Sequence, residues 1–206
     1  MDNGYELVGT VVRLQVQQAP LKVGERGRRR YEPAPITAVS RLTLTRGGVT
    51  GWEADESLLD VHHRDHPAGK YQDVNGVSVG FTSHYAVMRD RFGPHLTPGV
   101  AGENILIEAS RMVDAGDLRD GLVIVDRAGH PATLASLRVA EPCVEFTRYA
   151  MRYPPDAPAD PAFTAALDFL RAGMRGFYAT YTGDNAATIQ PGDRVYRPSG
   201  RAAGGA

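Results

Sequence analysis

The chain has 206 residues, with 23 lysines and arginines against 24 aspartates and glutamates, and a formal net charge of −1 at pH 7. This length fits one domain with a sizeable core, and the near-neutral charge argues against a dedicated nucleic-acid-binding protein. The single cysteine excludes a disulfide within the chain and favours a reducing compartment.

We therefore predict a cytoplasmic protein with neither nucleic acid nor a membrane among its partners. The N-terminal stretch MDNGYELVG is acidic and has no long apolar run, so we do not expect it to be a signal peptide. No window approaches the roughly 20 apolar residues of a membrane helix.

Short apolar stretches separated by turn residues run through the chain, and its 23 glycines and 14 prolines fall mostly between them. Several stretches alternate apolar and polar residues, which is typical of half-buried strands. The predicted strands are Leu7–Gln15, Thr37–Leu44, Asn104–Glu108, Leu122–Val125, Thr133–Val139, Phe177–Tyr181 and Arg194–Tyr196.

Two segments show helical spacing. Thr82–Phe92 begins with a candidate Thr/Ser cap and repeats large apolar residues every three or four positions. Pro161–Ala172 follows Asp160 as its cap and stops at Gly173. The whole pattern predicts a β-rich barrel with a few helices, in one domain over residues 1–198, followed by a disordered glycine-rich tail over 199–206.

Cys143, the only thiol, follows Pro142, which ends the preceding strand and lets CVEFTRYAM form a short helix. A cysteine at a helix N-terminus feels the positive end of the dipole, which favours a reactive thiolate. Nearby arginines would add to this effect, whereas Glu141 would oppose it. The alternative is a small buried hydrophobic residue.

The stretch DVHHRDHPAGKY contains His62, His63 and His66. Imidazoles are common metal ligands, but Pro67 interrupts a helix here and no zincin motif is present. We favour a pocket wall, with a metal-dependent hydrolase as the alternative, and assign no metal ligand.

Two further segments carry arginine. RGRRR over Arg26–Arg30 is either a solvated loop or a contact for an anionic ligand. Arg175 lies in GMRGFYATY, where it would act as an anion clamp or simply follow a helix stop.

The stretch PGVAGENI over Pro98–Ile105 combines turn-forming residues with Gly102, Glu103 and Asn104 directly before a strand. Loops of this kind often carry function. The alternative is a polar turn between two strands.

Taken together, these segments resemble the MOSC domain family, named after the C-terminal domain of molybdenum cofactor sulfurase. PGVAGENI resembles the family's Gly-x-x-Gly-Glu-Asn pattern, and EPC at Glu141–Cys143 resembles its Pro-Cys motif about forty residues downstream. GMRGFYA and IQPGDRVY resemble its C-terminal motifs. The stretch EADESLLDVHHRDHP departs from the family, because its histidines lack the Gly-Gly pair that usually follows.

The resemblance implies a mostly β fold, a closed β-barrel of the MOSC type with a few peripheral helices. It implies a pocket formed by Cys143 as catalytic residue, with Gly102, Glu103, Asn104, Arg175, His62 and His66 contacting a cofactor. The cofactor would be the molybdenum cofactor (molybdopterin), and this chain would bind no pyridoxal phosphate itself.

Three hypotheses follow. The first is a sulfur carrier or sulfurtransferase that uses a Cys143 persulfide, with a separate cysteine desulfurase as donor and a small molecule or cofactor as acceptor. The second is a non-covalent binding module for the anionic pterin cofactor, or a component of a reductase or detoxification system for N-hydroxylated compounds, as some family members are. The third is the histidine-based hydrolase.

Overall fold

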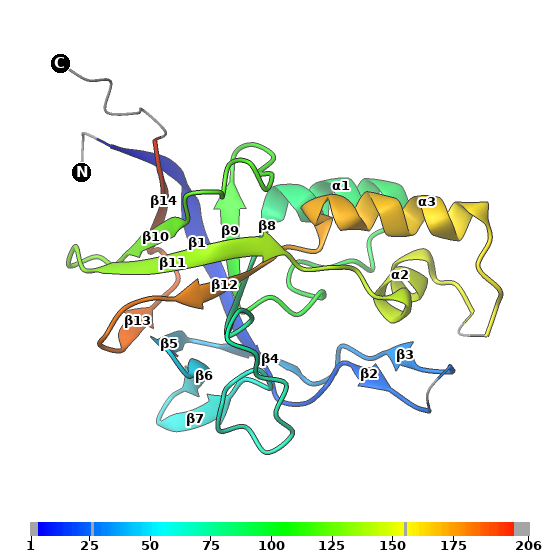
Figure 1. Cartoon of the computed structure of the whole chain (residues 1–206), viewed down its shortest axis with the longest axis horizontal. Helices are drawn as coiled ribbons and strands as arrows, with labels where there is room; N and C mark the ends of the chain where they lie inside the picture. Colours follow the sequence, from blue (N-terminus) through cyan, green and yellow to red (C-terminus); the bar gives the residue numbers. More distant parts are fainter. Residues whose placement is uncertain (1–3, 26, 155, 200–206) are drawn as a thin grey trace.

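The computed structural model describes residues 4–25, 27–154 and 156–199. Its centre is a closed, seven-stranded β-barrel in the order β14-β10-β11-β12-β8-β9-β1, in which β14 pairs back onto β1 (Figure 1). The barrel strands are β1 (Tyr5–Gln17), β8 (Val77–Phe81), β9 (Ile105–Ala109), β10 (Leu122–Val125), β11 (Pro131–Val139), β12 (Phe177–Tyr181) and β14 (Arg194–Pro198). The predicted closed barrel is confirmed.

All neighbouring barrel strands are antiparallel except β8 and β9. Parallel strands need a crossover, and α1 (Thr82–Phe92) supplies it. Inside the barrel, the apolar residues of all seven strands form one continuous core. The barrel therefore gives the molecule its rigid frame.

Smaller units surround one end of the barrel. A four-stranded sheet consists of β13 (Ala187–Ile189), β5 (Arg41–Thr45), β6 (Gly48–Glu53) and β7 (Glu56–Leu59). A two-stranded ribbon pairs β2 (Lys22–Val23) with β3 (Arg30–Tyr31), and β4 (Ile36–Val39) extends the main sheet beside β1.

The helices gather on the side of the barrel where the ribbon lies (Figure 1). They are α1, α2 (Val144–Met151) and α3 (Pro161–Phe169), which runs into an irregular turn, η1 (Leu170–Met174). A second apolar core joins α1, α2 and η1 to Tyr31 of β3 and to the loop before β9. The junction between the two cores is where the candidate site lies.

Most predicted elements are present, with differences at particular residues. The predicted strand Thr37–Leu44 is divided at Ser40, whose backbone N–H donates to the Trp52 carbonyl oxygen at 3.0 Å, so that β4 and β5 belong to different sheets. Strands β2, β3, β6, β7, β8 and β13 were not predicted. The tail beyond residue 199 lies outside the described residues, and the domain boundary at 198 stays a prediction.

The predicted Thr/Ser cap of α1 is wrong, because Phe81 at the end of β8 occupies the cap position and no side chain caps the helix. The Asp160 cap of α3 is confirmed, since its Oδ1 accepts from the Phe163 N–H at 2.7 Å. The segment predicted as helix to Ala172 leaves α-helical geometry after Phe169, and Gly173 turns the chain with φ +89°.

Gly9 provides a test of barrel closure, because it lies where β1 pairs with both β9 and β14. A Cβ at this position would sit against the Glu108 carbonyl oxygen. We expect Gly9→Ala to lower the free energy of unfolding by about 2 kcal/mol or more, measured by urea denaturation. Gly4→Ala is the matched control, since no atom lies within 4 Å of the place that its methyl group would occupy. An equal effect of both variants would contradict the argument.

Candidate functional site

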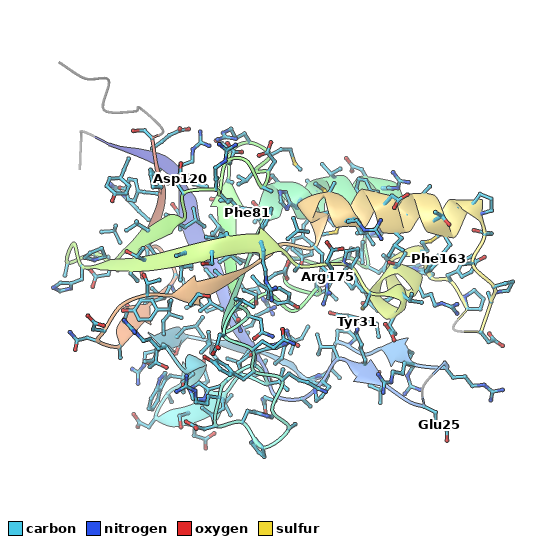
Figure 2. All side chains as sticks on the ribbon, in the orientation of Figure 1. Glu25, Tyr31, Phe81, Asp120, Phe163 and Arg175 are labelled. Atoms are coloured by element: carbon cyan, nitrogen blue, oxygen red, sulfur yellow. The ribbon has the colours of Figure 1, made fainter. Side chains whose placement is uncertain are left out.

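A cavity of about 700 Å³ opens where the end of the barrel meets the β2–β3 ribbon and the loop after β7. We call it the basic cavity. It is lined by Gln17, Pro20, Leu21, Lys22, Arg29, Tyr31, Val61, His62, Lys70, Gln72, Asn75, Arg138, Val139, Glu141, Arg175 and Tyr178. Figure 2 shows Arg175 and Tyr31 at this junction, far from Asp120 at the other end of the barrel.

The lining of the basic cavity is strongly positive. Five lysines and arginines face a single carboxylate, that of Glu141, which already pairs with Arg171 at 3.5 Å. Lys22 has a partial partner in Glu145, at 3.7 Å. Guanidinium groups match the geometry of phosphate and carboxylate oxygens, so this cavity is suited to an anionic ligand.

Arg175 is the most deeply placed of these cations. It follows η1, and the tight turn between Gly173 and Gly176 brings it to the inner wall. Its Nη1 donates to the Glu141 carbonyl oxygen at 3.0 Å, and its guanidinium lies 5.4 Å from the centre of the Phe146 ring. Its buried Nε has no hydrogen-bond partner among the described residues.

The guanidinium of Arg175 keeps its positive charge. Burial alone would lower its pKa, but the ionisable groups around it, Tyr31 and Cys143 first among them, outweigh burial and the pKa is raised above its ordinary value. A half-buried cation with a spare N–H donor is a natural contact for a ligand anion or a nearby thiolate.

Cys143 is the N-cap residue of α2 and is half-buried. Its extended backbone places Sγ to accept a hydrogen bond from the Phe146 N–H at 3.3 Å. The sulfur interacts electrostatically with Arg175 and packs against the second apolar core. Cys143 is not itself a lining residue of the basic cavity, but Glu141, two positions earlier, is.

The bend at Gly102, Glu103 and Asn104 lies inside the protein. Gly102 has φ +92°, and its carbonyl oxygen accepts from Nε2 of Gln17 at 2.7 Å. Glu103 and Asn104 are both buried. Gly102 and Glu103 line a small void of about 10 Å³ together with Arg175, which is space for about one water molecule.

Asn104 ties the bend to its surroundings. Its Oδ1 accepts from both the N–H and the hydroxyl of Ser78, at 3.0 and 2.9 Å, and its Nδ2 donates to Asp60 at 2.8 Å. The amide is thus fully used within the protein, and Asn104 supports the cavity wall from behind.

Glu103 is held by Tyr85, whose hydroxyl lies 2.7 and 2.9 Å from the two carboxylate oxygens. Burial raises the pKa of Glu103 from 4.5 to about 7, although the Tyr85 hydrogen bond and the charge of Arg175 act in the opposite direction. A buried carboxyl group with a pKa raised to about 7 therefore lines the small void next to Arg175.

His62 lines the basic cavity and is fixed by a buried carboxylate that no sequence motif marks. Nδ1 of His62 lies 3.0 Å from Oδ1 of Asp60, whose Oδ2 accepts from the Gln17 N–H at 2.8 Å. Burial would raise the pKa of Asp60, but these hydrogen bonds hold it below its ordinary value.

His66 lies apart from His62. Its Nε2 is 3.2 Å from the Gln18 carbonyl oxygen, its Nδ1 accepts from the Ala68 N–H at 3.1 Å, and it does not line the basic cavity. Across the described ranges, no three His, Cys, Asp or Glu side chains come together as a candidate metal site.

The structure adds several residues to the site. Lys70, Arg138 and Tyr31 line the basic cavity without having been predicted to do so. The sequence could have indicated the pair Asp60–His62, because a carboxylate two positions before a histidine can form a hydrogen bond with the imidazole ring. Within RGRRR, Arg29 contributes to the lining and Arg26 lies outside the described residues.

A family model for the MOSC domain matches residues 68–196, which is more than half of the chain. The chain belongs to the MOSC domain family. The match contains the Gly102–Asn104 bend, Cys143 and Arg175, so the main residues of the site lie within the MOSC domain. No curated protein matches the sequence.

Solved structures align with most of this chain at low sequence identity, and the two with TM-scores above 0.5 share its fold. The YuaD protein of Bacillus subtilis is 13% identical with a TM-score of 0.55, and the alignment covers 93% of this chain and 96% of that one. A protein described only as hypothetical is 11% identical with a TM-score of 0.52, covering 93% and 68%. YiiM of Geobacillus stearothermophilus is 15% identical with a TM-score of 0.47, covering 94% and 75%. Among the helices described, none has the length and apolar character needed to cross a membrane.

The raised pKa of Glu103 predicts how stability depends on pH. Between about 4.5 and about 7 the folded MOSC protein keeps a proton that the unfolded chain has lost, so this contribution to stability falls as the pH rises and is constant above that range. We expect the free energy of unfolding, relative to that of Glu103→Gln, to fall by a few kcal/mol, an order-of-magnitude figure, from pH 5 to pH 8. Urea denaturation of both proteins at each pH measures it, and parallel pH profiles would refute it.

Proposed function

We propose that this MOSC protein is a sulfur carrier that holds sulfane sulfur as a persulfide on Cys143 and delivers it to an anionic acceptor in the basic cavity. The observation that supports this most directly is the position of the thiol: it caps α2 and interacts with the half-buried Arg175, which itself lines the cavity.

The surroundings of Cys143 suit a sulfur anion. The N–H of Phe146 donates to Sγ, and the positive end of α2 and the guanidinium of Arg175 both stabilise negative charge there. The same groups would stabilise a persulfide anion, which is one sulfur atom longer and would reach further toward the space beside Arg175.

The loading step needs a persulfide donor. The Cys143 thiolate attacks the outer sulfur of a donor persulfide, R–S–SH, so that a new S–S bond forms at Cys143, the donor S–S bond breaks and R–S⁻ leaves with the electron pair. The sulfur is transferred at the sulfane oxidation level without an external oxidant. We propose a cysteine desulfurase as the donor, a separate protein that would hold the pyridoxal phosphate.

The chain has no second cysteine to resolve the persulfide as an internal disulfide. The outer sulfur must therefore pass to an acceptor outside the chain, either a thiol or a bound cofactor. The basic cavity, with Arg175 between it and Cys143, is the place where such an acceptor would bind.

The residues of the basic cavity fit the molybdenum cofactor as an anion. Lys22, Arg29, Lys70 and Arg138 would contact its phosphate and other charged oxygens, and the spare Nε donor of Arg175 would contact a group close to Cys143. When bound, the cofactor would supply metal-centred redox chemistry, and the role of the chain would be to bind and orient it.

The second candidate is a binding module that holds this cofactor without covalent chemistry, alone or within a reductase or detoxification system for N-hydroxylated compounds. One observation favours it: the cations line the basic cavity directly, whereas Cys143 does not belong to its lining. The two candidates differ in whether the sulfur of Cys143 is needed.

Intact-protein mass spectrometry tests the sulfur carrier. After incubation with a cysteine desulfurase and cysteine, we expect the wild-type protein to gain the mass of one sulfur atom and to lose it on treatment with a reducing thiol. Cys143→Ser, the matched control, should gain nothing because it lacks the nucleophile. An unchanged wild-type mass, in a reaction where the desulfurase itself is loaded, would eliminate the sulfur-carrier proposal.

Equilibrium binding of isolated molybdenum cofactor tests the cavity assignment separately. We expect Arg175→Gln to weaken binding about ten-fold or more, since it removes a charge-assisted hydrogen bond. Arg119→Gln, which alters an exposed arginine outside all the cavities described, should bind as the wild type does. If Cys143→Ser binds normally but no persulfide forms on the wild type, the binding module is the better description.

A further inference from the structure

A second cavity, of about 380 Å³, borders α2 and the β2–β3 ribbon. We call it the α2 pocket. It is lined by Arg29, Arg30, Tyr31, His95, Glu145, Arg148, Tyr149, Arg152 and Tyr153. None of the functions considered above uses it, and it shares only Arg29 and Tyr31 with the basic cavity.

We propose that the α2 pocket binds a small planar aromatic anion. Two independent observations support this. Three arginines without side-chain partners in the described part of the chain line the pocket, and one of them has an unfavourable backbone conformation.

The positive charge on the pocket is only partly compensated by its two nearby carboxylates, those of Glu145 and Glu32. Arg29, Arg30 and Arg152 make no ion pair and no side-chain hydrogen bond with any residue that the structure describes. The one carboxylate of the lining, that of Glu145, is already 3.7 Å from Lys22. Arg148 is used differently, because its guanidinium donates to the carbonyl oxygens of Pro154 and Ala157 at 2.8 Å.

The aromatic side chains suit a flat ligand. Tyr31 and Tyr149 lie with ring centres 5.3 Å apart, and His95 lies 5.7 Å from Tyr149. Tyr31 is fixed by its hydroxyl, which donates to the Val100 carbonyl oxygen at 2.8 Å. These rings offer stacking and edge contacts to a further aromatic ring, while the guanidiniums at the edge pair with its negative group.

Arg152 provides the second observation. It ends α2 in the left-handed region, with φ 52° and ψ 38°, a position that is usually occupied by glycine. A side chain with a Cβ is strained there. The backbone N–H of Arg152 caps the helix by donating to the carbonyl oxygens of Arg148 and Tyr149, whereas within the described ranges its side chain makes no hydrogen bond or ion pair. Burial and the negative charge of Glu32 raise the pKa of Tyr149, and the charge of the Arg152 guanidinium acts in the opposite direction, which places both charges near the ring. Strain of this kind is typical of residues retained for binding.

Calorimetric titration of the full chain with phenyl phosphate tests the proposal, with inorganic phosphate and benzyl alcohol as probes of the charge and the ring alone. We expect phenyl phosphate to bind at least ten-fold more tightly than either. Adenosine monophosphate and benzoate then serve as further probes. Binding of adenosine monophosphate would identify a nucleotide as the natural ligand. Binding of benzoate would identify an aromatic carboxylic acid as the natural ligand.

Three variants localise the binding. Arg152→Asn removes the guanidinium but tolerates the left-handed backbone, so it should fold as the wild type does and weaken phenyl phosphate binding about ten-fold. Arg152→Lys should retain most of the affinity. Arg119→Asn, the same change at an exposed arginine outside the pocket, should have no effect.

Three results would overturn the proposal: no binding of phenyl phosphate at millimolar concentration, equal binding of inorganic phosphate, or a folded Arg152→Asn variant that binds as well as the wild type. None of these results bears on Cys143, because persulfide formation is measured separately.

Discussion

The buried carboxylate of Asp60 is the interaction on which the candidate site depends. Its two oxygens accept hydrogen bonds from the backbone N–H and Nδ1 of His62, from the Gln17 N–H and from the Asn104 amide, at 2.8 to 3.0 Å. A buried charge is stable only when it is satisfied in this way. One side chain therefore connects the end of β1, the loop after β7 and the bend before β9, and these three segments form one wall of the basic cavity.

Much of the fold could be predicted from sequence, because short alternating stretches and turn residues are local signals. The β-rich barrel, α1 and the Asp160 cap of α3 follow from such signals, whereas the closure of the barrel was implied by the resemblance to the MOSC family. The strands that were not predicted show where local signals fail. Strand β8 (VSVGF) is only five residues long, and both its apolar residues and the Ser and Gly between them are buried, which depends on its neighbours in the fold. Strand β6 contains glycine and tryptophan at positions that are explained only by its pairing with β5 and β7. The break at Ser40 depends on a hydrogen bond to Trp52, which is a tertiary contact.

The site was predictable where a motif marks it and not where the cavity depends on segments far apart in sequence. The Gly-Glu-Asn bend and the Pro-Cys motif lie close to the basic cavity that forms the candidate site. They do not reveal that Asn104 uses all of its amide inside the protein, or that Glu103 is paired with Tyr85. Lys70 and Arg138 have no motif at all, and become neighbours only when the barrel end and the loop after β7 meet.

The pairing of β14 with β1 also constrains how the chain folds. These two strands are separated by nearly the whole sequence, with Leu7 opposite Tyr196 and Thr10 opposite Arg194. Contacts of such long sequence separation must close a very large loop before they contribute any stability, and proteins dominated by them fold slowly. On the ribosome, β1 therefore emerges without its partner β14, and one of its edges stays unpaired until β14 has been synthesised.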